Sequence, residues 1–215
     1  MMRLVVVFGV ILAAAAPAPA QTFVGAAVGA STQGEGASDQ PYLGPPFGGT
    51  SGAVVAMADF APARNVALGG EVSLAGAISG TQSQRASGGS NTFVSEHRDT
   101  VFSGTFKVGT PFDAPVRVAF VLGAGVAERH TARTGAFNPG FGLRPSTPFT
   151  ETLTDWVPAF TVGADLGASL TRHVGLLGLA RVHRLKDDDR LPDGVVKRGV
   201  SSAIVRLGGG VQLKF

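Results

Sequence analysis

Seven charged side chains recur on one side of alternating segments, and they are the residues of this sequence best placed to do chemistry together. They comprise three carboxylates and four cations: Asp59, Glu71, Lys107, Arg117, Asp165, Arg181 and Arg206. Charges gathered inside a small protein must be paired, because an uncompensated buried charge is costly. One interpretation is a gated ion path or a catalytic acid–base pair. The interpretation we favour is a network of ion pairs that fills the interior.

Nucleophilic catalysis would need a hydroxyl, a histidine and an orienting acid within reach of one another. The candidates are His183 with Asp187, Asp188 and Asp189, or His97 with Glu96 and Asp99, each with Ser201 or Ser95. No spacing singles out one serine, and histidines and acids at strand tips are more often solvated rim residues. We therefore expect no catalytic site.

Metal and cofactor chemistry also finds little support. The acidic run from Lys186 to Arg190 lacks the alternating-ligand spacing of a calcium loop, so it is interpreted as a solvated loop apex. The chain has no cysteine, which excludes disulfides, thiolate metal sites, catalytic thiols and a lipoprotein anchor. We expect neither a metal nor a cofactor.

Eight segments of strand character would position the charged residues. Each alternates between two faces, one of them largely apolar, as the side chains of a β-strand do. The segments are 21–31, 52–61, 66–78, 99–110, 116–127, 155–170, 174–183 and 200–215. Connections of about three to five residues alternate with connections of roughly fifteen or more, which follows the short-turn and long-loop rule of membrane barrels.

Two segments carry details that a structure can test. In the third segment, Ile78 falls on the apolar face with Val66 and Leu74, while Glu71 faces the other way. In the sixth segment, Pro158 cannot donate to a strand ladder, and we expect a bulge there.

The amino-terminal residues have the pattern of an export signal. Arg3 precedes the apolar run 4–16, and Ala18-Pro19-Ala20 forms a small-x-small site before Gln21. The apolar run of about thirteen residues is shorter than the roughly twenty that a spanning helix needs. We predict a cleaved signal peptide over 1–20 and one domain over 21–215. Removing Arg3 leaves 17 Lys and Arg against 15 Asp and Glu, which does not point to nucleic acid.

The carboxy-terminal segment is strictly two-sided. One face reads Phe215, Leu213, Val211, Gly209, Leu207, Val205 and Ala203, and the other carries Lys214, Gln212 and Arg206. Val211, Leu213 and the terminal Phe215 resemble the assembly signal with which bacterial outer-membrane barrels finish.

Taken together, these features resemble the small eight-stranded outer-membrane barrels of the OmpA and OmpX type. The resemblance implies an all-β fold, an eight-stranded antiparallel up-and-down transmembrane β-barrel. Lipid cannot satisfy free strand edges, so the last strand must pair with the first. Gly25, Gly29 and Gly208–Gly210 leave little bulk at that seam, which either eases closure or makes room for interior side chains.

The expected aromatic girdle is Phe60, Phe102, Phe106, Phe112, Phe160 and Phe215, with Trp156 and Tyr42 the sole residues of their kinds.

The same resemblance sets the expected partners. They are outer-membrane lipid and lipopolysaccharide, the barrel assembly machinery through the last strand, and a surface ligand that the sequence does not identify. The expected long loops are 32–50, the Ser/Gly/Gln-rich and mobile 79–95, and a third loop that contains 137–145. Arg129, Arg133 and Arg144 are expected to face anionic lipopolysaccharide.

We therefore expect a non-enzymatic barrel of the bacterial outer membrane, with a lumen plugged by ion pairs and a role in envelope integrity or adhesion through its surface loops. Two alternatives remain. The first is a lipid A modifying outer-membrane enzyme. The second is a soluble periplasmic calycin-like barrel, which would place apolar residues inside and polar residues outside.

Overall fold

The structure, a computed structural model, describes residues 21–35, 48–86, 89–139, 149–186 and 200–215. These residues form nine strands: β1 (Gln21–Glu35), β2 (Gly49–Ala63), β3 (Val66–Ala75), β4 (Ile78–Ala86), β5 (Gly89–Gly109), β6 (Val116–Pro139), β7 (Phe149–Ser169), β8 (Val174–Leu185) and β9 (Val200–Lys214). None of the described residues forms a helix long and apolar enough to cross a membrane.

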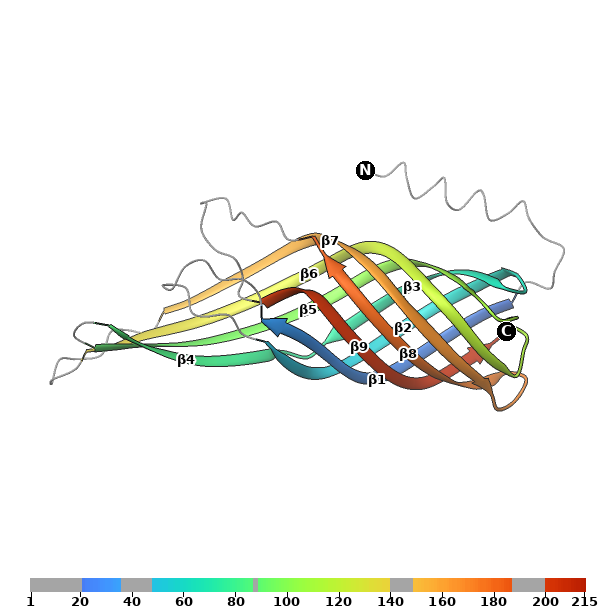
Figure 1. Ribbon diagram of the computed structural model, residues 1–215, viewed down its shortest axis with the longest axis horizontal. Helices are drawn as coiled ribbons and strands as arrows, with labels where there is room; N and C mark the ends of the chain where they lie inside the picture. Colours follow the sequence, from blue (N-terminus) through green and yellow to red (C-terminus); the bar gives the residue numbers. More distant parts are fainter. Residues whose placement is uncertain (1–20, 36–47, 87–88, 140–148, 187–199) are drawn as a thin grey trace.

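The strands close into a barrel in which each neighbouring pair is antiparallel (Figure 1). Because β3 and β4 both pair with β5, they are two pieces of one barrel strand, and the barrel has eight. Strand β9 pairs with β8 on one side and with β1 on the other. The predicted eight-stranded antiparallel barrel, closed between its last and first strands, is confirmed.

The break between β3 and β4 changes which residues face inward. Leu74 pairs with Thr100, and Ile78 pairs with His97, so four steps along one strand match three along the other. The extra residue makes a bulge at Gly76 and Ala77, and it reverses the alternation beyond that point. Ile78 is therefore buried inside the barrel, and the prediction that it lies on the outer face is wrong.

The expected bulge at Pro158 is also absent, since the β6–β7 register runs without a shift through this residue. The carbonyl of Pro158 accepts a hydrogen bond from Lys186 N at 2.8 Å, just past the end of β8. In an antiparallel strand the N–H and C=O of one residue point to the same neighbour. The missing N–H of Pro158 therefore falls where the β7–β8 ladder ends, and no bulge is needed.

Four strands extend well beyond the closed barrel (Figure 1). We call this part the protruding sheet: it consists of β4, residues 89–99 of β5, residues 128–139 of β6 and residues 149–156 of β7. At about 3.3 Å per residue, its β6 portion is roughly 35 Å long. Residues 79–95 lie mostly in the β4–β5 hairpin of this sheet, so the prediction of a long loop there is wrong. The short turns 64–65, 110–115 and 170–173 lie at the opposite end, which we call the turn end.

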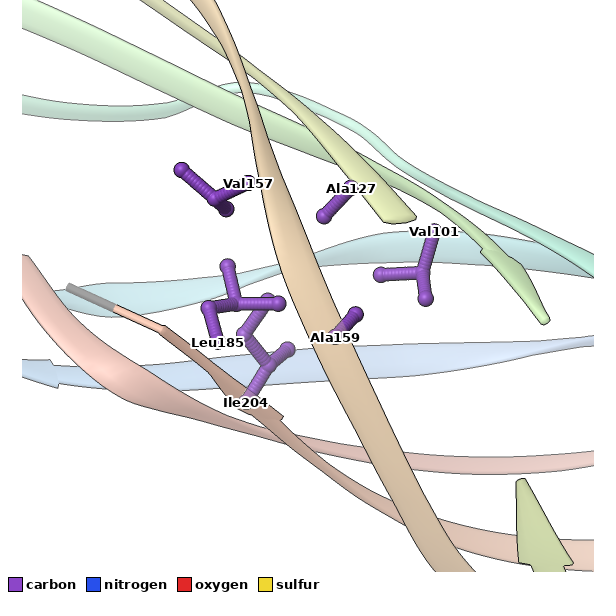
Figure 2. Close-up of a cluster of buried hydrophobic side chains, with 6 residues drawn as sticks. All are labelled: Val101, Ala127, Val157, Ala159, Leu185 and Ile204. Carbon is purple, nitrogen blue, oxygen red and sulfur yellow. The ribbon is translucent and has the colours of Figure 1, made fainter. Parts of the chain in front are cut away.

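The apolar and polar faces of the strands are arranged as the sequence predicts. Large apolar side chains on the outer face are widely exposed, including Val28, Phe120, Phe160, Leu166 and Leu207. The lumen holds most of the buried charged residues together with three small apolar clusters. One cluster, drawn in Figure 2, joins Val101, Ala127, Val157, Ala159, Leu185 and Ile204 across β5, β6, β7, β8 and β9. A charged lumen inside an apolar outer wall is the arrangement of a barrel made for lipid.

The seam glycines serve both of the purposes that the sequence suggests. A Cβ at Gly210 would overlap the carbonyl oxygen of Ala26, so the backbones of β9 and β1 approach closely there. A Cβ at Gly25 would instead meet Met57 Cγ at 3.2 Å and Leu177 Cδ2 at 3.3 Å. Gly210 therefore permits close pairing at the seam, whereas Gly25 leaves room for lumenal side chains.

Candidate functional site

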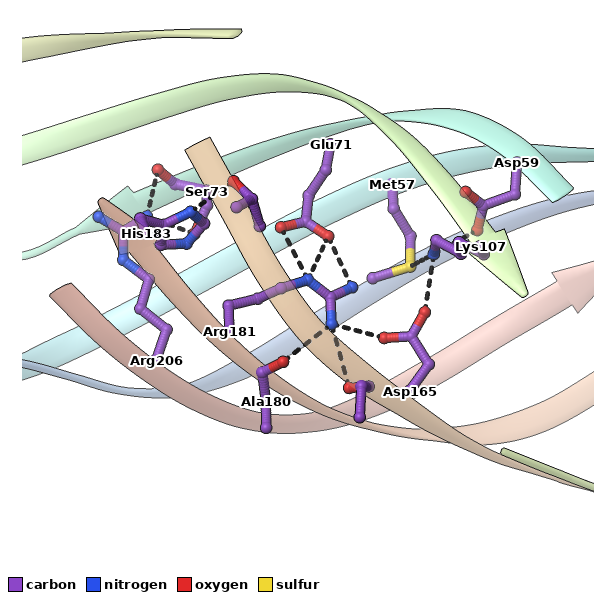
Figure 3. Close-up of polar contacts among 12 residues, drawn as sticks. Met57, Asp59, Glu71, Ser73, Lys107, Asp165, Ala180, Arg181, His183 and Arg206 are labelled. Carbon is purple, nitrogen blue, oxygen red and sulfur yellow. Dashed lines mark hydrogen bonds and ion pairs between the residues drawn. The ribbon is translucent and has the colours of Figure 1, made fainter. Parts of the chain in front are cut away.

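The centre of the lumen holds one ammonium group between two carboxylates (Figure 3). Lys107 Nζ on β5 donates to Asp59 Oδ2 on β2 and to Asp165 Oδ2 on β7, each at 2.8 Å. The side chains of Lys107 and Asp59 are almost fully buried, and that of Asp165 is nearly so. These strands meet across the lumen, so the three groups tie opposite walls of the barrel together.

Arg181 on β8 extends this chain of charges toward β3. Its Nη2 donates to Glu71 Oε2 at 2.7 Å, and its Nε donates to the same oxygen at 2.9 Å. Its Nη1 lies 2.7 Å from Asp165 Oδ1. Acids and cations therefore alternate across the lumen, in the order Asp59, Lys107, Asp165, Arg181 and Glu71.

The other two predicted members of the network face the lumen but form no ion pair with any described residue. Arg117 donates to the side-chain oxygen of Gln212, and its guanidinium lies 4.8 Å from the ring centroid of Phe23. Arg206 is fully buried. It donates to Ser31 Oγ at 3.3 Å, to the Asp99 carbonyl at 3.0 Å and to both oxygens of Ser73. Neutral acceptors thus hold two of the seven predicted residues.

Apolar side chains lie on both sides of the charged centre. Near the turn end, Phe112 packs on Phe23 with ring centroids 5.8 Å apart. Phe112 is buried, so its expected place in the outer aromatic girdle is wrong: the turn that carries it folds under the barrel, where Phe112 N donates to the Arg64 carbonyl at 2.6 Å. On the other side of the centre lies the cluster of Figure 2.

A second polar cluster lies on the inner face of the protruding sheet. His97 Nε2 is 2.9 Å from Asp99 Oδ2, and His97 Nδ1 is 2.7 Å from Thr131 Oγ1. Arg129 Nε donates to Asp99 Oδ1 at 3.2 Å. The candidate combination of His97, Asp99 and Ser95 contains part of this cluster, but Arg129 and Thr131 were not expected in it, because the predicted strand 116–127 ends before them. The sequence signal for a longer strand was the alternation of side chains, with Ser95, His97 and Asp99 on one face and Glu96 and Arg98 on the other.

The cluster also corrects the expected positions of two cations. Arg129 and Arg133 are buried on the inner face of β6, and Arg133 Nε donates to Ser95 Oγ at 3.4 Å. They do not face the surroundings of the barrel, because the strand alternation continues through both positions. Arg144 lies outside the described residues.

Of the predicted catalytic combinations, the described residues bring His97 and Asp99 into contact, but Ser95 Oγ accepts a hydrogen bond from Arg133. His183 is fully buried in the lumen and contacts Thr161 Oγ1 at 2.9 Å. Ser201, in contrast, is one of the alternate residues of β9 that face outward. Glu96 is exposed on the face opposite His97. The residues 187–190, as well as 1–20 and Tyr42, lie outside the described part of the chain.

The outer face changes character where the protruding sheet begins. Phe102 and Trp156 stack with centroids 5.8 Å apart and planes inclined by 29°, and Trp156 is 58% exposed. Beyond this pair the outward positions are mostly polar, and His130 Nδ1 contacts Thr154 Oγ1 at 2.9 Å. An aromatic pair between an apolar and a polar zone is typical of a membrane–water boundary.

No family model matches this sequence, and no curated protein matches it. Its structure is similar to a major outer membrane protein from Thermus thermophilus, with 15% identity, a TM-score of 0.50 and coverage of 91% of this chain and 99% of the other. Ail, the attachment invasion locus protein of Yersinia pestis, has 10% identity, a TM-score of 0.47 and coverage of 91% of this chain and 98% of the other. Neisserial surface protein A has 13% identity, a TM-score of 0.43 and coverage of 90% and 97%. The chain therefore has the fold of a small eight-stranded outer-membrane β-barrel.

Proposed function

We propose that this protein is an integral barrel of the bacterial outer membrane, exported by the signal peptide predicted over 1–20, with a structural or surface-interaction role. The observation that carries the proposal is the distribution of polarity. Valine, leucine and phenylalanine side chains form the outer wall, and ion pairs fill the lumen. A soluble calycin-like barrel with an apolar ligand would need the reverse arrangement.

The lumen in this proposal is plugged. An eight-stranded barrel is just wide enough for side chains to fill it. Here the alternating charges from Asp59 to Glu71 cross the interior, and the Phe23–Phe112 pair lies near the turn end. We propose a structural part for these groups, and no conduction of ions in the resting state.

The surface role falls to the protruding sheet and the loops. Its outer face is polar, and residues 149–156 of β7 pair on one side only among the described residues. A strand edge of this kind can accept a strand from another protein. The proposal is thus adhesion or envelope contact through this sheet, rather than catalysis. The polar cluster of His97 is buried, which does not favour a lipid-modifying enzyme.

Single cysteines test the proposed placement directly, because the chain contains none of its own. We expect a membrane-impermeant maleimide to label Thr152→Cys on intact cells, since Thr152 is exposed on the protruding sheet. Arg172→Cys, at the turn end, should react only after the outer membrane is permeabilised. Phe160→Cys, in the apolar wall, should react only after denaturation in detergent.

Each variant must first be shown to fold. A difference in gel mobility between the unboiled and the boiled protein provides that evidence. Labelling of Phe160→Cys in the native membrane fraction would overturn membrane insertion. Labelling of Arg172→Cys but not Thr152→Cys on intact cells would invert the topology and remove the proposed surface role. An unchanged lipid A profile in cells carrying His183→Ala would count against the enzyme alternative.

A further inference from the structure

A small pocket lies at the turn end of the lumen, next to β1, β7, β8 and β9. Its polar lining comprises five side chains: Arg117, Ser169, Thr171, Gln212 and Lys214. Ser169 and Thr171 are exposed, so the pocket is reached from the side of the turns. Its volume of about 10 Å³ admits a group about the size of one water molecule.

Arg117 places a positive charge beside this pocket. It is only 9% exposed, and its guanidinium lies 4.8 Å from the ring centroid of Phe23. A Cβ at Gly167 would lie 2.7 Å from Arg117 Nη2, so β7 leaves room for this group because it has a glycine there. The single side-chain hydrogen bond of Arg117 to a described residue goes to Gln212. Most of its N–H donors are therefore available to a ligand.

The other polar groups of the pocket also have donors to offer. The Thr171 hydroxyl accepts hydrogen bonds from two backbone N–H groups, at 3.2 and 3.0 Å, so its own O–H is left to donate. The side-chain oxygen of Gln212 accepts from Arg117, which leaves the amide NH₂ to donate. Lys214 adds an ammonium group to the same lining. A pocket with two cations and several further donors suits an anion.

Carboxylates lie behind this pocket and do not line it. Arg117 also lines a deeper cavity of about 20 Å³, together with Asp59 and Asp165. An anion that enters from the turns would meet Lys214 and Arg117, and the two carboxylates beyond them would repel it. The pocket is therefore a place where an anion stops, which agrees with a plugged lumen.

The other acids of the chain are paired or attached at the opposite end of the barrel. Asp113, the acid of the described turns, forms an ion pair with Arg64 at 3.1 Å. Residues 1–20, which precede β1 at the turn end, contain no acid. The acids outside the described residues are Asp39, Asp187, Asp188, Asp189 and Asp193. The strand ends that flank their segments lie opposite the turns (Figure 1).

We propose that this pocket binds the free carboxylate at the end of a periplasmic peptide. A carboxylate carries two oxygens in one plane, which is the geometry that guanidinium donors match. The volume holds about one oxygen, so the rest of the peptide lies outside the barrel, across the turns. The inference rests on the proposed function, because that orientation places the turn end in the periplasm.

The test is a titration of the folded, detergent-solubilised full chain with acetyl-alanyl-alanine, followed by the NMR shifts of the Gly175 and Gln212 amides. We expect saturable shifts in the wild type, and none with the same peptide when its carboxyl group is amidated. Lys214→Gln and Arg117→Gln should each weaken binding at least about tenfold, because each removes a charge-assisted contact.

Two further variants separate the pocket from the general charge of the turn end. Ser169→Leu should abolish binding, because the larger side chain fills the pocket and leaves every charge in place. The matched control is Arg172→Gln, which removes an exposed cation of the same turns that does not line the pocket and should bind like wild type. Each variant must show heat-modifiable mobility. If Arg117→Gln does not fold, Lys214→Gln and Ser169→Leu carry the test.

Several outcomes would overturn the proposal. They are equal shifts with the amidated peptide, equal weakening by Arg172→Gln and Lys214→Gln, unchanged binding by Ser169→Leu, and displacement of the peptide by an equal concentration of chloride or inorganic phosphate. If the cysteine pattern above holds and the peptide does not bind, this inference alone fails. If Arg172→Cys is labelled on intact cells, the pocket does not face the periplasm, and the proposed topology fails together with the periplasmic ligand.

Discussion

Lys107 is the residue on which the charged centre of the lumen depends most. Its ammonium group contacts two carboxylates at equal distances of 2.8 Å, and it lies 3.4 Å from Met57 Sδ. Without this cation, Asp59 would keep no ion-pair partner among the described residues, and Asp165 would keep only Arg181. A buried carboxylate left alone is much costlier than a neutral group of the same size.

We predict that Lys107→Met destabilises the barrel by about 3–5 kcal/mol, the cost of removing one partner of a buried ion pair. The measurement is urea unfolding in lipid vesicles, followed by the fluorescence of Trp156, the single tryptophan of the chain.

Two comparisons separate charge from packing in this experiment. Arg172→Met, at an exposed turn position, should change the free energy of unfolding by less than about 0.5 kcal/mol. The triple variant Lys107→Met/Asp59→Asn/Asp165→Asn should be more stable than Lys107→Met alone, because no unpaired carboxylate remains at the site. A triple variant less stable than the single one would show that the pairing of charges is not what Lys107 contributes.

Strand pairing at the seam is decided by the glycines of β9. A Cβ at Gly210 would overlap the backbone of Ala26 on β1, whereas a Cβ at the adjacent Gly209 would have Leu177 O as its nearest neighbour, at 3.8 Å. Both residues lie in the strand that closes the barrel. They therefore form a matched pair in which only one position has no room for a side chain.

We predict that Gly210→Ala destabilises the closed barrel by about 1–3 kcal/mol, as overpacking does, and that Gly209→Ala leaves its stability nearly unchanged. Refolding into vesicles, scored by the fraction of heat-modifiable protein, measures the difference. Equal folded fractions for the two variants would contradict the close approach of β1 and β9.

How much of each element could be predicted depended on how clearly its side chains alternate. Strands such as β6 alternate valine and phenylalanine with small or charged residues, and they were predicted correctly near the turn end. The β4–β5 hairpin is rich in serine, glycine and glutamine, whose alternation carries no contrast in hydrophobicity, so it was predicted to be a loop. The one-residue bulge at Gly76 and Ala77 also left no sign, because glycine and alanine fit either face.

The sequence predicts which residues belong to the interior site better than it predicts which of them contact one another. Alternation placed all seven charged residues on the lumenal face, since it depends on sequence alone. Which acid meets which cation depends on strand register and on barrel closure. Arg181 on β8 meets Glu71 on β3 only because the sheet curls into a tube. The neutral acceptors around Arg206 come from β1, β3 and β5, and no local pattern could reveal them.

On the scale of the whole molecule, the aromatic pair Phe102–Trp156 should mark the depth of the barrel in the membrane. The outer wall is apolar on one side of this pair and mostly polar on the protruding sheet. Aromatic rings with a polar edge prefer the headgroup level. Phe160 lies four residues farther into the wall on the same strand, about 13 Å along it and about 9 Å deeper at a strand tilt of about 45°.

We predict that Trp156 fluorescence in vesicles is quenched most by lipids brominated close to the headgroup. In a Trp156→Phe background, Phe160→Trp should be quenched most by lipids brominated farther down the acyl chain, because the barrel wall carries this position deeper. Both proteins must first show heat-modifiable mobility, so that only folded barrels are compared. Identical depth profiles for the two proteins, or quenching of the Phe160→Trp fluorescence by aqueous iodide, would place the apolar wall outside the bilayer and contradict the proposed membrane insertion.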